Sequence, residues 1–150
     1  DTAQPTMLTS GYKHNVIPQT ATAALDCRFL PGHEESLMAT IRELAGEHVE
    51  VEVMHRDTAL DAPFTGSLVE AMKQALLAED PDAHVLPYCL SGGTDNKAVS
   101  RLGITGYGFA PLRLPPELDF VSMFHGIDER VPVESLRFGA RVLRRFLDLA

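Results

Sequence analysis

The sequence predicts an α/β protein in two parts, and three observations lead to this fold class. Two stretches within residues 1–56 alternate apolar and polar residues, which is typical of half-buried strands. A helical stripe of apolar residues lies between these two stretches. After a short stretch without periodicity, apolar runs alternate with amphipathic stretches, which indicates the strands and helices of an α/β sheet domain.

Residues 1–56 predict the order strand, strand, helix, strand. The last two strands alternate apolar and polar residues, and the helix carries apolar residues at i, i+4 and i+7. The four elements are expected at residues 6–12, 19–30, 33–46 and 48–56. This order describes an open-faced α+β sandwich, which is most of a ferredoxin-like unit without its first strand and helix.

Residues 57–150 predict the C-terminal part of an α/β sheet domain with helices on both faces. The domain boundary is expected near Asp57–Asp61, in a linker without periodicity. Helices are expected at residues 66–80, 94–103 and 132–150, and buried strands at 83–92 and 104–110. The proline-rich loop before the last helix is longer than an ordinary connection between two elements of a compact domain.

Composition and charge exclude several classes of function. The 150 residues are 45% hydrophobic and carry a formal net charge of −8, which argues against nucleic acid or an anionic membrane as a partner. No apolar run reaches the roughly 20 residues that span a bilayer, and no signal peptide is visible. Cys27 and Cys89 lie far apart, so we expect no disulfide scaffold, no cysteine zinc site and a reduced, cytoplasmic setting.

The stretch SGGTDN, residues 91–96, follows a predicted strand and opens a predicted helix. Glycines there let a ligand approach the backbone, and the helix N-terminus offers unpaired N–H groups, so the stretch predicts an anion or carboxylate site. A tight turn with a helix cap explains the same residues equally well. A nucleophilic Ser91 ranks last, because Cys89 stands where G-x-S-x-G has its first glycine.

His125 lies on the long loop after a predicted strand, where open α/β sheets gather functional groups. A neutral imidazole there is a candidate metal ligand, although a lone histidine is usually an ordinary loop residue. Asp128 and Glu129 either orient the histidine or form an acidic pair at the start of the last helix. The other histidines have no ligand spacing, so no metal site can be completed within this chain.

Arg28 lies two residues after Asp26 on the polar face of the second strand. Such a pair is most often solvated and contributes little. Its functional interpretation is a bidentate clamp for a substrate carboxylate. Asn15 lies upstream, just before the run Val-Ile-Pro.

These stretches together resemble the dinuclear-zinc exopeptidases and amidohydrolases, which include aminoacylase-1, acetylornithine deacetylase, succinyl-diaminopimelate desuccinylase and related carboxypeptidases. The resemblance is carried by NVIP, a D-x-R strand followed by PG, SGGTDN, and H-G-x-D-E-R before the final helix, in this order along the whole chain. It implies the C-terminal portion of such an enzyme. Residues 1–56 would be part of a lid and dimerisation domain, and residues 57–150 part of the catalytic domain.

The resemblance also implies roles for single residues. His125 matches a zinc ligand, Asn15 matches a substrate-binding residue that acts across the dimer, and Arg28 matches the residue that holds the substrate's carboxylate. Gly93 and Thr94 match a turn that lines the substrate. Lys97 departs from members that have arginine at this position, so its role stays open.

The same resemblance implies a metal-dependent hydrolase of an amide or peptide bond in a small substrate with a free carboxylate. Two zinc ions per complete site are expected, with cobalt or manganese as alternatives. The other ligands and the general base would come from an N-terminal segment, so no catalytic residue is expected here and this chain alone should be inactive. The first residue, Asp1, agrees with missing upstream sequence. The alternative is a non-catalytic α/β binding or dimerisation module with a structural His125.

Overall fold

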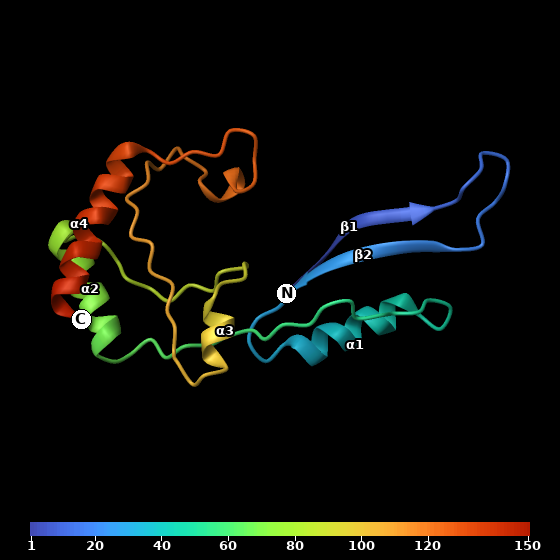
Figure 1. Ribbon diagram of the computed structural model, residues 1–150, viewed down its shortest axis with the longest axis horizontal. Coiled ribbons are helices and arrows are strands. Elements are labelled where there is room, and N and C mark those ends of the chain that lie inside the picture. Colours follow the sequence, from blue (N-terminus) through green and yellow to red (C-terminus); the bar gives the residue numbers. More distant parts are fainter. The chain divides into compact units, whose positions relative to one another are not determined.

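A computed structural model describes all of residues 1–150, which form two compact units. Unit 1 comprises Asp1–Asp61 and Cys89–Thr105, and unit 2 comprises Ala62–Tyr88 and Gly106–Ala150. The elements, in chain order, are the strands β1 (Thr2–Ser10) and β2 (Ala21–Arg28), the helices α1 (Glu34–Ala45), α2 (Ser67–Glu79) and α3 (Asn96–Ser100), the 3-10 turn η1 (Val121–Met123) and the helix α4 (Val133–Leu149) (Figure 1). The mixed α/β class expected from the sequence is confirmed at this level, while the domain limits at residues 1–56 and 57–150 stay a prediction.

Unit 1 is built on a two-stranded antiparallel ribbon of β1 and β2. The register runs from Thr2 opposite Arg28 to Ser10 opposite Ala21, so the two ends of the ribbon are fixed by these pairs. Both predicted strands are confirmed, and the first begins earlier than its residue pattern indicated. The ribbon therefore places Arg28 at one end and the connecting loop, residues 11–20, at the other.

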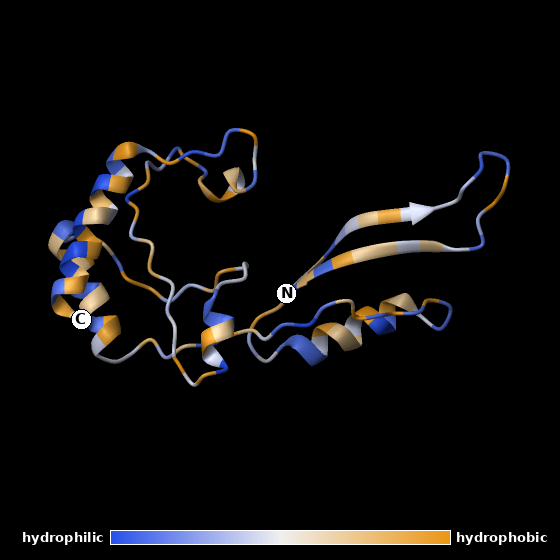
Figure 2. Cartoon of the chain, in the orientation of Figure 1, coloured by the Kyte–Doolittle hydropathy of each residue, from blue (hydrophilic) through white to orange (hydrophobic).

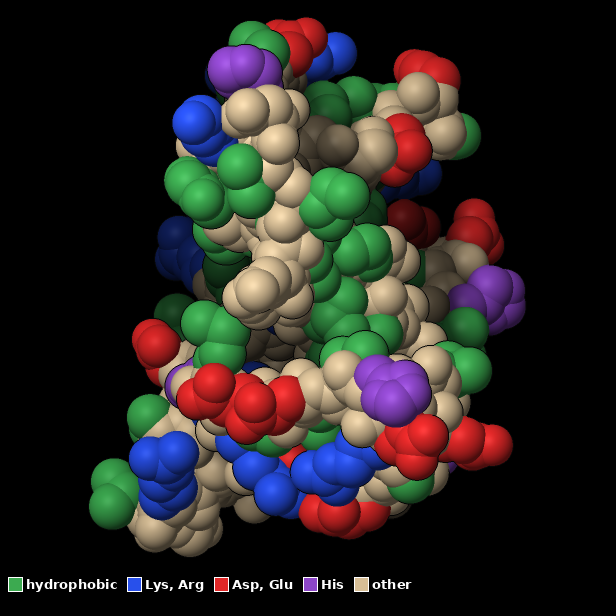
Figure 3. Space-filling model, turned by 90° about the vertical axis from the view of Figure 1, so that its right-hand side faces the viewer, with side chains coloured by type: hydrophobic (Ala, Val, Ile, Leu, Met, Phe, Trp, Pro, Cys, Tyr) green, Lys and Arg blue, Asp and Glu red, His purple; other side chains and the backbone are tan.

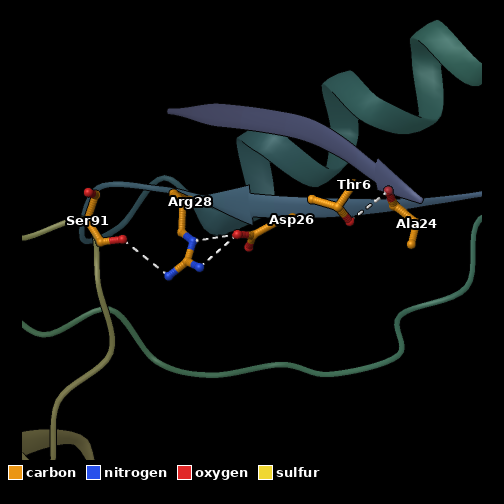
Figure 4. A network of polar contacts seen from close by, with 5 residues as sticks. All are labelled: Thr6, Ala24, Asp26, Arg28 and Ser91. Atoms are coloured by element: carbon orange, nitrogen blue, oxygen red, sulfur yellow. Dashed lines mark hydrogen bonds and ion pairs between the residues drawn. The ribbon is translucent and has the colours of Figure 1, made fainter. Parts of the chain in front are cut away.

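The ribbon has one irregularity, which lies in β1 between Pro5 and Met7. Pro5 has no N–H group to donate to a neighbouring strand, so it is tolerated where the ladder is interrupted. The hydroxyl of Thr6, the extra residue, donates a hydrogen bond to the carbonyl oxygen of Ala24 at 3.3 Å (Figure 4). This side-chain contact joins the two strands at the point where the register shifts.

The helix predicted at residues 33–46 is confirmed as α1, but it does not form the expected sandwich. Leu37 and Ile41 of its apolar stripe are half-buried, whereas Leu44 is 82% exposed. Helix α1 makes no close contact with either strand. A two-stranded ribbon is too narrow to cover the face of a helix, and stable packing of this kind needs three or more strands.

Three predicted strands are absent from the structure, and these predictions were wrong. They are the segments at residues 48–56, 83–92 and 104–110, which have no regular secondary structure. Each has the apolar pattern of a strand, but a strand also needs a neighbour that accepts its backbone hydrogen bonds. Without such a neighbour, apolar side chains such as Leu86 and Ile104 stay more than half exposed.

Unit 2 has a small core where α2 packs against α4, which confirms both predicted helices. Ala75, Phe138 and Val142 form the buried centre of this core. Gly139 allows the close approach of the preceding loop, because a Cβ atom there would lie 2.7 Å from the carbonyl oxygen of Pro111. The amphipathic pattern of α4 is visible as alternating hydrophilic and hydrophobic residues (Figure 2).

A bridge of charged side chains reinforces the pair of helices in unit 2. Glu79, at the end of α2, accepts hydrogen bonds from Arg141 at 2.7 Å and from Arg145 at 2.6 Å. These hydrogen bonds lower the pKa of the Glu79 carboxyl from its ordinary value, with the bond from Arg141 as the larger cause. The carboxylate side chain is only 11% exposed, so it is more shielded from solvent than most surface ion pairs.

Many large hydrophobic side chains are open to solvent, including Leu8 and Tyr12 in the ribbon and its loop. Hydrophobic side chains are visible at the surface among charged ones (Figure 3). None of the helices is both long enough and apolar enough to cross a membrane. Exposed apolar area of this kind is typical of surfaces that are covered by another polypeptide.

Candidate functional site

The residues expected to bind substrate or metal are divided between the two units. Asn15, Arg28, Gly93 and Thr94 belong to unit 1, and His125 belongs to unit 2.

Arg28, the last residue of β2, is the centre of a polar network. This network reaches the loop Ser-Gly-Gly-Thr at residues 91–94, called the SGGT loop below. Its Nε and Nη2 atoms donate to Oδ2 of Asp26 at 3.1 and 2.7 Å. Its Nη1 atom donates to the backbone carbonyl of Ser91 at 3.2 Å (Figure 4). Because Ser91 begins the SGGT loop, this network brings together two of the predicted substrate-binding elements.

The guanidinium group of Arg28 still has hydrogen-bonding capacity for a ligand. It carries five N–H groups, and the contacts with Asp26 and Ser91 use three of its nitrogen atoms once each. One N–H group on each terminal nitrogen therefore stays available, and the side chain is 48% exposed. A guanidinium with two such donors can hold a carboxylate through two parallel hydrogen bonds.

A shallow depression of about 400 Å³ lies beside the SGGT loop. Its lining combines loop residues with residues from the stretch after α1 and from α3. The lining residues are His55, Asp57, Gly93, Thr94, Asp95, Lys97, Ala98 and Arg101. The predicted residues Gly93 and Thr94 thus border a polar surface that contains both signs of charge.

Asp57 and Lys97 form an ion pair in this depression, with Nζ of Lys97 3.0 Å from Oδ2 of Asp57. The hydrogen bond from Lys97 lowers the pKa of the Asp57 carboxyl, and the backbone N–H of Thr58 lowers it further. Asp57 lies in the predicted linker, and Lys97 has no role predicted from the sequence. No local pattern identifies the pair, because its members lie on segments that are far apart in the chain.

Asn15 lies in the loop that connects β1 to β2 and is exposed. Arg28 lies at the opposite end of the ribbon, since Thr2 pairs with Arg28 and Ser10 pairs with Ala21. The 8 residues of β2 span about 25 Å at the ordinary rise of a strand. Asn15 and Arg28 of one chain are therefore too far apart to contact the same small molecule.

His125 lies on the loop between η1 and α4 and is exposed. Its backbone has a φ of +60°, which is uncommon for a residue other than glycine. The backbone N–H of His125 donates to Oε2 of Glu129 at 3.2 Å, so Glu129 contacts the backbone of the histidine. Asp128 instead pairs with Arg130.

The chain has no cluster of three or more His, Cys, Asp or Glu side chains that could hold a metal ion. His125 is a single donor, and Asp128 and Glu129 are engaged by Arg130 and by the backbone. The residues of this chain therefore do not form a complete metal centre. Cys27 and Cys89 are free thiols.

Comparison with known proteins defines the class of protein to which this arrangement belongs. Residues 1–52 match the model of the peptidase dimerisation domain, which covers β1, β2 and α1. The chain is similar to hydrolases over nearly its whole length, as the relatives below show. These matches make the chain similar to a part of peptidases and amidohydrolases.

Three relatives illustrate the similarity. The N-fatty-acyl-amino acid synthase/hydrolase PM20D1 of Mus musculus is 31% identical over 97% of this chain and 30% of the relative. The succinyl-diaminopimelate desuccinylase of Magnetococcus marinus is 34% identical over 97% of this chain and 38% of the relative. The aminoacylase-1 of Homo sapiens is 29% identical over 95% of this chain and 35% of the relative. No solved structure matches the chain significantly.

Residues 1–52 belong to the peptidase dimerisation domain family, and the whole chain is similar to part of the length of M20 peptidases. It spans 30% to 38% of the length of the three relatives described above. The family resemblance expected from NVIP, D-x-R, SGGTDN and H-G-x-D-E-R is therefore confirmed.

Proposed function

We propose that residues 1–150 are the C-terminal segment of an enzyme that hydrolyses an amide or peptide bond in a small substrate with a free carboxylate. The observation that carries this proposal is the position of Arg28, which contacts the SGGT loop and keeps two N–H groups for a ligand. The names of two relatives, an N-fatty-acyl-amino acid synthase/hydrolase and an aminoacylase, support an N-acyl amino acid as substrate. A dipeptide has the same carboxylate and is the other candidate.

In this proposal, Arg28 anchors the substrate by its carboxylate, and Gly93 and Thr94 border the bound molecule with their backbone. Two parallel hydrogen bonds to the carboxylate fix its orientation as well as its position. Asp26 keeps the guanidinium in place, because it occupies Nε and Nη2 on one side. A substrate without the carboxylate loses this anchor.

Asn15 acts on the substrate that is bound by a second copy of the chain. The length of the ribbon between Asn15 and Arg28 supports this arrangement, and the match to a dimerisation domain supports a homodimer. Exposed hydrophobic side chains in unit 1 agree with a surface that a second copy covers. The site is then complete only in the dimer.

His125 supplies one ligand to a metal centre whose other ligands lie outside residues 1–150. Zinc is the proposed metal, and cobalt or manganese are alternatives for a histidine and carboxylate site. The uncommon backbone conformation of His125 supports a functional position, since such conformations gather at functional sites. A cytoplasmic location, suggested by the two free cysteines, completes the proposal.

The first test is hydrolysis of N-acetylglycine by the full-length enzyme that carries this segment, with Arg28→Lys as the variant. Lysine keeps the positive charge but cannot form two parallel hydrogen bonds. We expect KM to rise about 10- to 100-fold, which corresponds to the ~1.5–3 kcal/mol of a charged hydrogen bond. N-acetylglycinamide, which has no carboxylate, is the matched control substrate, and its KM should be high and the same in both enzymes.

The second candidate is a non-catalytic binding or dimerisation module. The match of residues 1–52 to a dimerisation domain favours it. It predicts a stable dimer that hydrolyses neither substrate, with wild type and Arg28→Lys behaving alike. Hydrolysis of N-acetylglycine that depends on Arg28 would exclude this candidate.

A further inference from the structure

The SGGT loop belongs to a segment that leaves unit 1 and returns to it. Residues 62–88 belong to unit 2, and residues 89–105 lie with residues 1–61. Two polar contacts join the returning segment to residues 1–61. One is the hydrogen bond from Arg28 to the Ser91 carbonyl, and the other is the ion pair of Lys97 with Asp57.

These two contacts hold the loop at both of its ends. Ser91 lies just before the glycines, and Lys97 lies in the first turn of α3, just after the loop. The backbone N–H of Lys97 donates to the carbonyl oxygen of Thr94 at 3.1 Å, so the place of Thr94 depends directly on that of Lys97. Gly93 and Thr94 therefore lie between two residues that are held by contacts with residues 1–61.

The ion pair has the geometry of a fixed contact. Its side chains are 29% and 33% exposed, which is less than for most ion pairs of this chain. The other carboxylate oxygen of Asp57 accepts the backbone N–H of Thr58 at 3.0 Å, so the carboxylate is oriented before it meets Lys97. The side chain of Lys97 can change conformation, but the carboxylate of Asp57 is held by the backbone of Thr58.

We propose that Asp57 and Lys97 are positioning residues that keep Gly93 and Thr94 aligned with Arg28 for binding the substrate's carboxylate end. This inference rests on the proposed function and deepens it, because it assigns a task to a pair that does not itself contact the substrate. Glycines allow many backbone conformations, so a loop of this composition needs such attachments to hold one of them. The pair acts on the alignment of the loop and leaves the chemistry of the bond cleavage unchanged.

The first measurement is backbone order in the full-length enzyme, by ¹⁵N relaxation at Gly93 and Thr94. The variants are Asp57→Asn and Lys97→Met, which remove the ion pair from either side, and Lys97→Arg, which retains it. Wild type and Lys97→Arg should have order parameters of about 0.85, and the other two variants should fall below about 0.6. Lys73→Met is the matched control, because it removes a similar ion pair with Glu70 from unit 2.

The second measurement is steady-state kinetics with N-acetylglycine in the full-length enzyme. Asp57→Asn and Lys97→Met should each raise KM about tenfold with kcat unchanged, because misplaced binding groups weaken the anchor. The double variant should raise KM no more than either single variant, since both substitutions remove the same contact. Lys97→Arg and Lys73→Met should match the wild type.

Three results would overturn the positioning role. Unchanged order parameters in Asp57→Asn would show that the ion pair does not hold the loop. A higher KM in Lys97→Met without one in Asp57→Asn would make Lys97 a direct ligand of the carboxylate. A double variant whose rise in KM equals the product of the two single rises would also contradict a shared contact. If the wild-type enzyme hydrolyses neither N-acetylglycine nor a dipeptide, the proposed function fails, and the order parameters still decide whether the pair positions the loop.

Discussion

At the scale of single residues, Arg28, the proposed anchor for a carboxylate, is held by neighbouring groups and still has N–H groups for a ligand. The contacts with Asp26 and Ser91 restrict the guanidinium, yet each terminal nitrogen keeps an N–H group for a ligand. A free arginine would lose more conformational entropy when a carboxylate binds. In the network of Figure 4, part of the conformational entropy that Arg28 would lose on binding is therefore already lost when unit 1 folds.

The proposed role of His125 as a metal ligand is tested by metal content. We expect the full-length enzyme to hold about two divalent ions per subunit, as in two-metal hydrolytic sites. His125→Ala should lower this content by at least about one ion, because it removes one ligand. Plasma mass spectrometry of the dialysed proteins measures the effect, with His48→Ala, an exposed histidine of unit 1, as the control. Equal metal in all three proteins would make His125 an ordinary loop residue.

At the scale of elements, the bridge between α2 and α4 makes unit 2 sensitive to acid. Glu79 has a lowered pKa in the folded state, so its contribution is fully present above its ordinary value of 4.5. It is lost as the pH falls through the lowered pKa of the folded state, because protonation removes the charge that Arg141 and Arg145 face. Unit 2 should therefore unfold at lower temperature in acid.

Thermal unfolding of the chain between neutral and acidic pH measures this effect. Glu79→Gln should lower the melting temperature at neutral pH, and its difference from the wild type should shrink in acid. Glu134→Gln is the control, because Glu134 pairs with Arg137 on the exposed side of α4. A difference between Glu79→Gln and the wild type that stays constant with pH would argue against the bridge.

The elements also show how much the sequence can predict. Helices α1, α2 and α4 were predicted because a helix is stabilised by neighbours within its own segment, and their apolar periodicity is local. The segments at residues 48–56, 83–92 and 104–110 carry strand patterns but form no strands, because a strand needs a partner that its own residues do not specify.

The same distinction applies to the candidate site. Arg28 and the SGGT loop were found because each carries a recognisable local motif, and the structure adds that they are in contact. Asp57 was missed because nothing in its linker distinguishes it from other loop aspartates. Its importance depends on Lys97, which the fold brings beside it.

At the scale of the whole molecule, the proposed site is shared between subunits. Residues 1–52 match a dimerisation domain, and the ribbon separates Asn15 from Arg28 by the length of β2. A complete site then takes Arg28 from one subunit and Asn15 from the other. Closed two-fold dimers place two such sites in each molecule.

The most direct test of this account is complementation between two inactive full-length enzymes. Arg28→Met and Asn15→Ala should each hydrolyse N-acetylglycine poorly, since every site of either homodimer lacks one residue. After the two are unfolded together and refolded, half of the dimers are mixed, and each mixed dimer has one intact site. We therefore predict that activity returns to about a quarter of the wild-type value. No recovery in a preparation that contains mixed dimers would contradict the account, because it would place Asn15 and Arg28 in the same subunit's site or outside any site.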